Sequence, residues 1–586
     1  MDPQSGNRGR HDNPDDYVGN QTGPHSAGPV QGLSPQDYAI RISMLSETLS
    51  SSLRYGEMFR DLASFLGQPY ETHITAIDSI HTQVNNKTPC HFAAIRRFND
   101  QQGKFIPVST IQALEQLRSP GGLGRRDFSL VLLRGYPSAE VLNALGGHYL
   151  LYPEIFCSHL AFSSESAGRT TTASVHAPRL PSVSGDSVSL RMVTIGSYPD
   201  ISYLEDNQTI LDEFRMDASE SMAQYINRIS RLDHWHAAPC DSIVRDFSAH
   251  GLDQFSIEQQ ISISFQEVAC GMIGVVWHDA GRPLDEGYDG PWKAKGRRPV
   301  PGEVKYHFPT THYGRRTTFK DSLIMGTRSQ TPPSNDPSGI VDFIMQIYSH
   351  DIDPQRAQCD LFYSVSPWFH VVVSAEMDLL RELESKIRSE LDHDTLINQE
   401  FSTLSNLLYC QQELRRQVRN LTEPIEFMEG LNRRPWFQAL SAERQSECGE
   451  TIKSFLRDYR AALQYATALH RECVQGMTIV AHKATIQESA KAIVEARNVT
   501  RLTKLAMVFV PLSFMTSLYG MNLQEFGVEN APTIWSWVIA CLGLGALTTI
   551  IYRYYLSGDN KRRHGNRQVY GGEPQKAGLK RSLAAI

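Results

Sequence analysis

The pattern of hydrophobic and polar positions changes its period about halfway along the chain. In the first half, apolar residues alternate with other side chains or form short runs, which predicts strands. These stretches lie at residues 105–108, 129–133, 188–195, 261–265 and 272–277. Residues 36–67 instead have apolar positions at helical spacing. One mixed sheet with helices packed on it is therefore expected in this half.

The second half has helical spacing almost throughout. Helical patterns run from residue 368 to about 398, and from there to about 421. Pro424 and Pro435 are expected to bound a shorter helix, because proline disrupts a helix interior. No proline lies between Gly449 and Pro511. That interval allows one very long helix.

Apolar and small residues of this long helix recur at steps of three and four. They are Ile452, Phe455, Tyr459, Ala462, Ala466, Leu469, Cys473, Met477, Val480 and Ala484. This spacing is typical of a coiled-coil-like seam, which we expect to hold several copies together. Gly476 is expected to weaken the helix by about 1 kcal/mol without breaking it.

Two uncharged apolar runs lie near the C-terminus, at residues 505–519 and 534–552. Each approaches the roughly 20 residues that a helix needs to cross a bilayer. Arg501 and Lys504 precede the first run and Arg553 follows the second, whereas residues 523–533 contain no Lys or Arg. The positive-inside rule then predicts a multi-pass membrane protein with both termini in the cytoplasm.

The spacing of three and four continues into the first run. Val499, Leu502, Ala506, Val510, Ser513 and Ser517 fall on one helix face. This face either lines a pore or packs against other transmembrane helices, where Ser and Ala are also common. Two helices cannot enclose a water-filled path, so conduction would require several copies around a common axis.

Composition and the remaining motifs exclude other classes. The formal charge of −7 and the absence of a dominant basic stretch do not favour nucleic-acid binding. His278-Asp279 and His350-Asp351 have no accompanying nucleophile or phosphate loop, so we expect no enzyme and no cofactor. The nine cysteines form no C-x-x-C pair, and the cluster His234, His236 and Cys240 is not expected to bind a structural metal.

The residues around the end of the first run resemble the CorA magnesium-transporter superfamily. Pro511-Leu512-Ser513-Phe514 and Tyr519-Gly520-Met521-Asn522 precede a short acidic loop and a second span. The G-M-N tripeptide is the signature of that superfamily. Residues 134–138 and 277–281 look like the extended cytosolic domains of fungal CorA-like proteins. Residues 142–160 look like a family helix, with His159 where an aspartate is usual.

The resemblance implies a homopentameric funnel. Its fold would be an α+β or α/β cytosolic domain, a stalk helix continuous with the first span, and a second span outside it. The expected domains are a disordered tail at 1–35, a mixed α/β domain at 36–340 with a Ser/Thr-rich insertion at 163–187, a long-helix and stalk region at 341–500, a first span at 501–522, an outer loop at 523–533, a second span at 534–553 and a basic tail at 554–586.

The resemblance also implies the transport of a divalent metal ion, most of all Mg²⁺, across a lipid bilayer. Tyr519, Gly520, Met521 and Asn522 would form the selectivity filter, where neutral oxygens suit a hydrated ion. Ser513 and Ser517 would offer hydroxyls in the pore. Val499, Leu502, Ala506 and Val510 would line its narrower part. Glu525 and Glu529 would raise the cation concentration at the outer mouth. The plasma membrane is the expected location.

Two alternatives stay open. A ZntB-like zinc transporter has the same G-M-N layout, and a non-conducting membrane scaffold or sensor could keep the fold. Family members sense intracellular magnesium through stalk carboxylates, but the corresponding count from Asn522 reaches Thr485, which is not acidic. The sequence therefore gives no support for magnesium-dependent closure.

Overall fold

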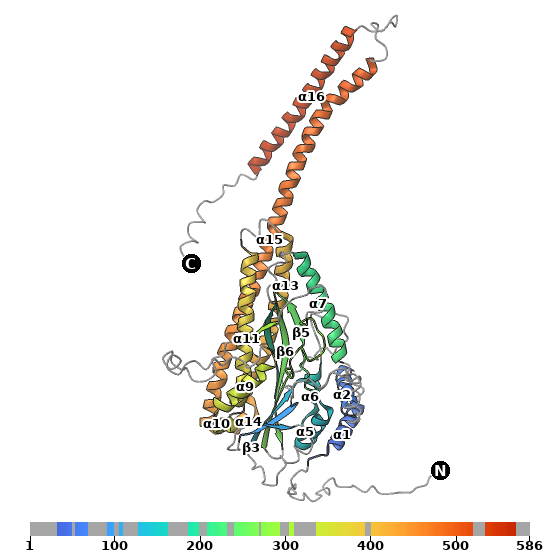
Figure 1. The fold of residues 1–586 in the computed structure, drawn as a ribbon. Coiled ribbons are helices and arrows are strands. Elements are labelled where there is room, and N and C mark those ends of the chain that lie inside the picture. The colour runs from blue at the N-terminus through green and yellow to red at the C-terminus, as the bar shows by residue number, and fades with distance from the viewer. Residues whose placement is uncertain are drawn as a thin grey trace, which may run out of the picture. The chain divides into compact units, whose positions relative to one another are not determined.

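The protein divides into two units, residues 1–477 and 478–586 (Figure 1). The computed structural model describes residues 32–49, 53–67, 91–98, 105–108, 127–161, 186–198, 208–230, 239–268, 271–293, 304–309, 336–392, 400–519 and 534–569. Most of the expected tail at 1–35 and of the expected Ser/Thr-rich insertion at 163–187 lies outside these ranges. Each unit is described below by itself.

The first unit contains an eight-stranded mixed sheet, as the alternating patterns predicted. Its strands are β1 (Ala93–Arg97), β2 (Ile106–Val108), β3 (Asp127–Arg134), β4 (Ser187–Ser197), β5 (Asp246–Ala249), β6 (Gln254–Val268), β7 (Gly271–His278) and β8 (Lys305–His307). The order is β2-β1-β3-β7-β6-β4-β8, with β5 paired to β6. Only the β3–β7 pair is parallel among the described strands, with Val131 opposite Val275.

Helices cover both faces of this sheet (Figure 1). On one face lie α1 (Pro35–Thr48), α2 (Leu53–Leu66), α5 (Ala139–Tyr149), α6 (Pro153–Leu160) and α7 (Gln208–Ile229). On the other lie α9 (Gly339–His350), α10 (Pro354–Cys359), α11 (Leu361–Glu390) and α13 (Glu400–Gly430). Both α11 and α13 contact β4, and α6 contacts β6. The sheet is thus buried on both faces, so that β6 buries both its apolar residues and the polar residues that alternate with them.

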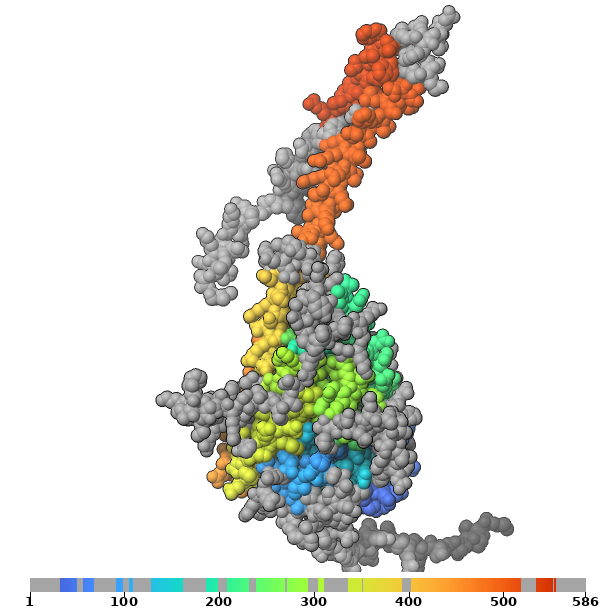
Figure 2. Space-filling model, viewed as in Figure 1, coloured from blue at the N-terminus to red at the C-terminus, as the bar shows by residue number. Residues whose placement is uncertain are grey.

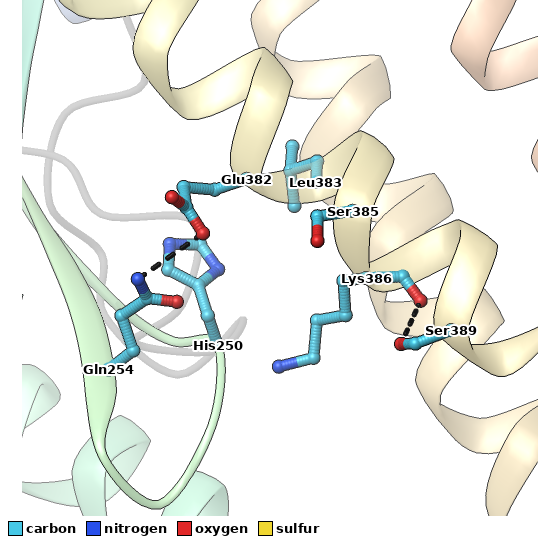
Figure 3. A pocket seen from close by; sticks show the side chains of 7 residues that line it. All are labelled: His250, Gln254, Glu382, Leu383, Ser385, Lys386 and Ser389. Atoms are coloured by element: carbon cyan, nitrogen blue, oxygen red, sulfur yellow. Dashed lines mark hydrogen bonds between the residues drawn. The ribbon is translucent and has the colours of Figure 1, made fainter.

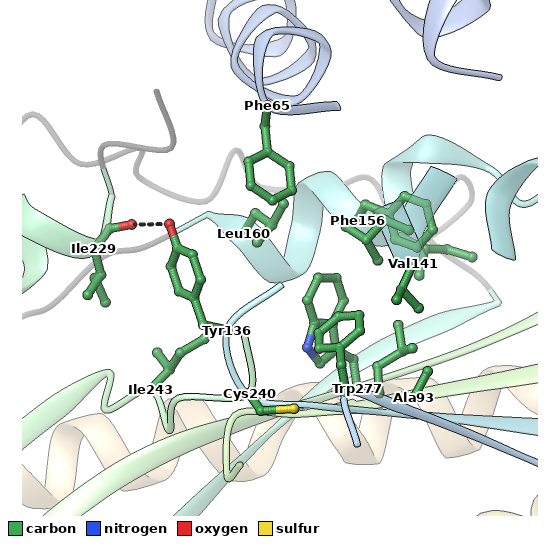
Figure 4. Packing of buried hydrophobic residues seen from close by; sticks show 14 of the residues in the cluster. Phe65, Ala93, Tyr136, Val141, Phe156, Leu160, Ile229, Cys240, Ile243 and Trp277 are labelled. Carbon is green, nitrogen blue, oxygen red and sulfur yellow. Dashed lines mark hydrogen bonds between the residues drawn. The ribbon is translucent and has the colours of Figure 1, made fainter. Parts of the chain in front are cut away.

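Trp277 of β7 lies among the buried residues of the hydrophobic core between the sheet and α5 and α6 (Figure 4). Its side chain is fully buried, and its indole nitrogen donates to the Gly135 carbonyl at 3.1 Å. The Phe156 ring meets it edge-on at 6.2 Å, and the His159 ring stacks on it at 4.1 Å. Large aromatic side chains contribute strongly to core stability when their polar atom has a partner. Trp277 therefore joins the sheet to α6.

Residues 134–138 and 277–281, which had resembled fungal CorA-like domains, meet in the structure at Cys240. Cys240 donates its N–H to the Tyr136 carbonyl at 3.1 Å, and its own carbonyl accepts from Arg282 at 2.7 Å. A Cβ on Gly281 would lie 1.9 Å from that carbonyl. Only glycine allows so close a backbone approach. The two segments 134–138 and 277–281 therefore have a structural role at the ends of β3 and β7.

The long helix is α15, which runs over Ala442–Tyr519. In the first unit its predicted seam is buried against α11 and α13 of the same chain. The Tyr459 hydroxyl donates to the Phe369 carbonyl at 3.0 Å, and the Cys473 thiol donates to the Leu407 carbonyl at 3.1 Å. This corrects the expectation that the whole seam joins separate copies, because the part before residue 477 is occupied within one chain.

Pro424 does not bound a helix, contrary to expectation. It lies inside α13, which continues to Gly430, whereas Pro435 begins the short helix α14 (Pro435–Gln438). Leu421, on one side of Pro424, and Met428, on the other, are fully buried. Packing on both sides of the proline offsets the lost backbone hydrogen bond, so tertiary contacts override the local signal.

Gly476 allows a close contact between α15 and the end of α11. A Cβ at this position would lie 2.6 Å from the Leu391 side chain, whereas a Cβ on Gly449 of the same helix would meet nothing within 4 Å.

We predict that Gly449→Ala raises the free energy of unfolding by up to about 1 kcal/mol, because alanine favours helix. Gly476→Ala should gain less or lose stability, because Leu391 must move. Chemical denaturation of both variants measures this, and equal gains would show that the Leu391 contact is loose.

Candidate ion pathway

The second unit contains two apolar helices. One is the C-terminal part of α15, and the other is α16 (Ile534–Val569). Both contain a segment that is long and apolar enough to cross a membrane, and no described side chain in either segment is buried (Figure 2). The helix α16 extends beyond the expected end of the second span at residue 553. The expected basic tail thus begins as a continuation of this helix.

All six predicted lining positions lie on α15. Val499, Leu502 and Val510 are 63%, 72% and 65% exposed, and Ala506, Ser513 and Ser517 are exposed as well. At about 100° per residue, these six positions fall within about 80° of the helix circumference. We call them the lining strip. A single chain covers none of it, so any function of the strip requires a partner or a membrane.

Acidic and basic side chains lie mostly on different sides of the same stretch of α15, with Lys491 as an exception close to the acidic side. Glu488 and Glu495 lie fourteen and seven residues before Leu502, which places them on the lining strip's side of the helix. Arg497, Arg501 and Lys504 lie on the opposite side by the same spacing. All six are exposed. The sequence reasoning missed these two acids, although their spacing of seven was a readable signal.

The residues expected to select the ion are not described. Tyr519 is the last residue of α15, and only its backbone is described. Gly520, Met521, Asn522, Glu525 and Glu529 lie outside the described residues. The structure therefore places the lining strip on one face of α15. The filter and the outer-loop acids remain expectations from the sequence.

A Ser–His–Asp constellation does occur, but in the core of the first unit. His159 lies with Nδ1 2.9 Å from the Ser262 hydroxyl and Nε2 3.1 Å from Asp279. Asp279 also accepts from Arg245 at 2.7 and 2.8 Å. His159 and Asp279 have no exposed surface at all. Since no substrate could reach these groups, the constellation holds α6, β6 and β7 together.

Burial and charge set the protonation of this constellation. Burial lowers the pKa of His159 to about 4, although the Asp279 carboxylate opposes that change. Burial alone would raise the pKa of Asp279, but the Arg245 guanidinium and His159 outweigh it and hold that pKa well below its ordinary range. Near neutral pH the pair is therefore a neutral imidazole beside an ionised carboxylate.

The first unit also has a small cavity of about 150 Å³ (Figure 3). Its lining includes His250, Gln254, Glu382 and Lys386, so it lies between the β5–β6 turn and α11. Gln254 donates to Glu382 at 3.3 Å, and burial lowers the pKa of Lys386. A volume of this size holds about five waters. The described part of the chain contains no group of three or more His, Cys, Asp or Glu side chains that could hold a metal.

Comparison with known families points to the helical part of the chain. Residues 331–563 match the family model described as CorA-like Mg²⁺ transporter protein. This stretch contains α9 through α15 and most of α16. No curated protein matches the chain. With its two apolar helices and this family match, the chain is a membrane protein.

The buried Asp279–Arg245 pair gives a prediction for stability. We expect Asp279→Asn to lower the free energy of unfolding by about 3–5 kcal/mol, because it leaves a buried guanidinium without its counter-charge. Asp378→Asn is the matched control, since Asp378 pairs with Arg381 at an exposed site and should cost less than about 1 kcal/mol. Denaturant unfolding followed by tryptophan fluorescence compares the two. Similar losses would contradict the assigned role of Asp279.

The lowered pKa of His159 adds a pH dependence. Its folded-state pKa lies below the unfolded value, so the unfolded state binds more protons in acid. The contribution of His159 to stability is therefore present above about pH 6.5 and is lost as the pH falls toward about 4.

Proposed function

Because residues 331–563 are CorA-like, we propose that this chain transports divalent metal cations, most of all Mg²⁺, through a pore formed by several copies. The observation that carries the proposal is the lining strip on α15. Its apolar and hydroxyl-bearing positions are exposed over five successive turns, and Glu488 and Glu495 continue it on the same side. A ring of such helices would bury the strip around a central path.

The chemistry of the strip suits a hydrated divalent ion. Magnesium gives up its water reluctantly, so neutral oxygens that hydrogen-bond to the hydration shell favour passage over tight binding. The Ser513 and Ser517 hydroxyls would serve within the pore. The Gly520 carbonyl and the Asn522 amide oxygen would serve at its outer mouth. Val499, Leu502 and Val510 would form narrow apolar stretches that gate by dewetting.

Carboxylates at both ends would concentrate cations. Glu525 and Glu529 would do so outside, and Glu488 and Glu495 inside, because a ring of like charges raises the local concentration of counter-ions. Arg497, Arg501 and Lys504 would face away from the axis. On the positive-inside rule, both termini would be cytoplasmic. We further propose a pentamer in the plasma membrane, on the resemblance to the CorA superfamily.

Two rival functions make different use of the same residues. A ZntB-like zinc transporter would have the same G-M-N layout and add a dependence on protons. A membrane scaffold or sensor would keep the helices without conduction. The hydroxyl groups of the lining strip and the two carboxylates that continue it favour conduction, because a helix that only packs against its neighbours has no need of carboxylates on that side.

Replacement of Asn522 tests the transport function. We predict that the parent chain restores growth of cells that lack their own magnesium uptake, and that Asn522→Ala does not. Asn530→Ala, in the same loop but outside the tripeptide, is the matched control and should behave as the parent. Membrane abundance of each variant is measured alongside. Failure of the parent to rescue, or equal rescue by Asn522→Ala, would remove the support for transport.

Competition among metal ions then identifies the substrate. In proteoliposomes, magnesium influx should fall when cobalt or nickel is added and should not require a proton gradient. A flux that prefers zinc and collapses without the gradient would favour the zinc-transporter alternative.

A further inference from the structure

A cluster of buried ionisable groups lies where α13 packs against the sheet. Arg416 of α13 pairs with Asp246 of β5, donates to Glu413 at 2.5 Å, and lies 3.7 Å from Glu258 of β6. The Ser248 hydroxyl donates to Glu413 at 3.1 Å and accepts from Arg416 at 2.8 Å. All five side chains are buried. One guanidinium therefore bridges three carboxyl groups from three elements.

A fourth carboxyl group belongs to the same cluster. Glu376 of α11 is 1% exposed and interacts electrostatically with Glu258 and Arg416. One end of the Gln417 side-chain amide lies 2.8 and 3.2 Å from the two Glu376 oxygens. Tyr459 of α15 is also close enough to interact with Glu376. The cluster thus joins β5, β6, α11, α13 and α15.

The charges of this cluster do not balance. Asp246, Glu258, Glu376 and Glu413 supply four carboxyl groups, whereas the basic partners are Arg416 and Arg191, which lies 3.6 Å from Glu258. Full ionisation would leave an excess of two negative charges in a buried site. Uncompensated buried charge is too costly to persist, so such groups take up protons instead.

We propose that the interface between the sheet and helices α11 and α13 is a proton-dependent clamp. It closes when Glu376 and Glu413 carry protons and loosens when they ionise beside Glu258 and Asp246. Protonation of these two carboxyls neutralises the cluster. Ionisation places four carboxylates around two guanidiniums, and the resulting repulsion pushes α13 away from β5 and β6.

Burial favours the protonated form of both carboxyls, although the hydrogen bonds that Glu413 accepts from Arg416 and Ser248 oppose it there. Burial raises the pKa of Glu376 well above its ordinary value, with the Glu258 charge adding to it and Arg416 opposing it. Burial also raises the pKa of Glu413, against the opposing charge of Arg416. Gln417 can serve Glu376 in both states, because its carbonyl accepts from a carboxylic acid and its nitrogen donates to a carboxylate.

The sign of the pH effect follows from these directions. In the folded protein both groups hold protons at a pH where the unfolded chain has lost them. The contribution of these two groups to the free energy of unfolding is therefore fully present below the unfolded pKa of about 4.3. It is lost as the pH rises through the folded pKa of each group. Each proton that only the folded state holds changes the unfolding equilibrium about tenfold per pH unit.

The test compares Glu376→Gln and Glu413→Gln with the parent, in the full-length protein in lipid nanodiscs. Glutamine mimics the protonated carboxyl, so each variant should lose up to one proton's worth of the parent's decline in stability as the pH rises above the unfolded pKa of about 4.3. Glu429→Gln is the matched control on the same helix, because Glu429 is half exposed and pairs with Arg460 at 2.6 Å. Its pH profile should equal that of the parent.

Hydrogen exchange shows where the clamp loosens. In the parent, amides of α13 and β5 should lose protection as the pH rises, beyond the intrinsic pH dependence of exchange, and Glu376→Gln should keep them protected. An infrared band from a protonated carboxyl at neutral pH, absent in Glu376→Gln, is a second readout that does not depend on stability. Parent-like pH profiles in both glutamine variants, or no such band in the parent, would overturn the proposal.

The clamp does not depend on the transport function, and the two can fail separately. A pH dependence of transport that originates here should vanish in Glu376→Gln, whereas proton coupling along the lining strip should persist in that variant. Absence of transport in the parent would leave the exchange and infrared results unaffected.

Discussion

The burial of α15 ends partway along the helix, and the organisation of the chain depends on this fact. Up to Gly476 its seam packs against α11 and α13, where Tyr459 and Cys473 each donate to a backbone carbonyl of those helices. Beyond Val480 none of its described side chains is buried, yet the spacing of three and four continues to Ser517. Apolar surface of that extent is not stable in water. The first part of this helix is therefore covered by protein, and the rest needs a membrane or a protein partner to cover it.

Within the first unit, the first part of that helix packs on a layered core. Its sheet is buried on both faces, and Trp277 fills the centre of the core on one side. On the other side α13 is held by charges rather than by apolar contacts alone, with Arg416 at the centre. Such a buried cluster is sensitive to proton number because each added carboxylate charge repels the other carboxylates in a site of low dielectric constant. On the clamp proposal, the packing of α13 therefore weakens as the pH rises and these carboxyls ionise.

The sequence predicted the elements whose signal is local and strong. The strand at β7, the long helix α15, which has no proline before Pro511, and the two apolar helices could all be predicted from the sequence pattern. Pro424 misled the prediction, because buried residues on both sides of it keep α13 intact. The helices that pack against the seam of α15 could not be predicted either, because the spacing of apolar residues does not show whether the partner helix belongs to the same chain. Glu376 and Arg416 lie 40 residues apart in sequence, so their joint burial could be found only from the fold.

The most direct test of the central claim is magnesium flux through liposomes after thiol modification. Ser513→Cys places a thiol on the lining strip, and Leu512→Cys places one about 120° around α15 from the centre of the strip, both with Cys541 replaced by serine. A charged methanethiosulfonate reagent should block flux through the Ser513→Cys protein and leave the Leu512→Cys protein conducting. Equal block of both, or block only at residue 512, would contradict a pore lined by this face of α15.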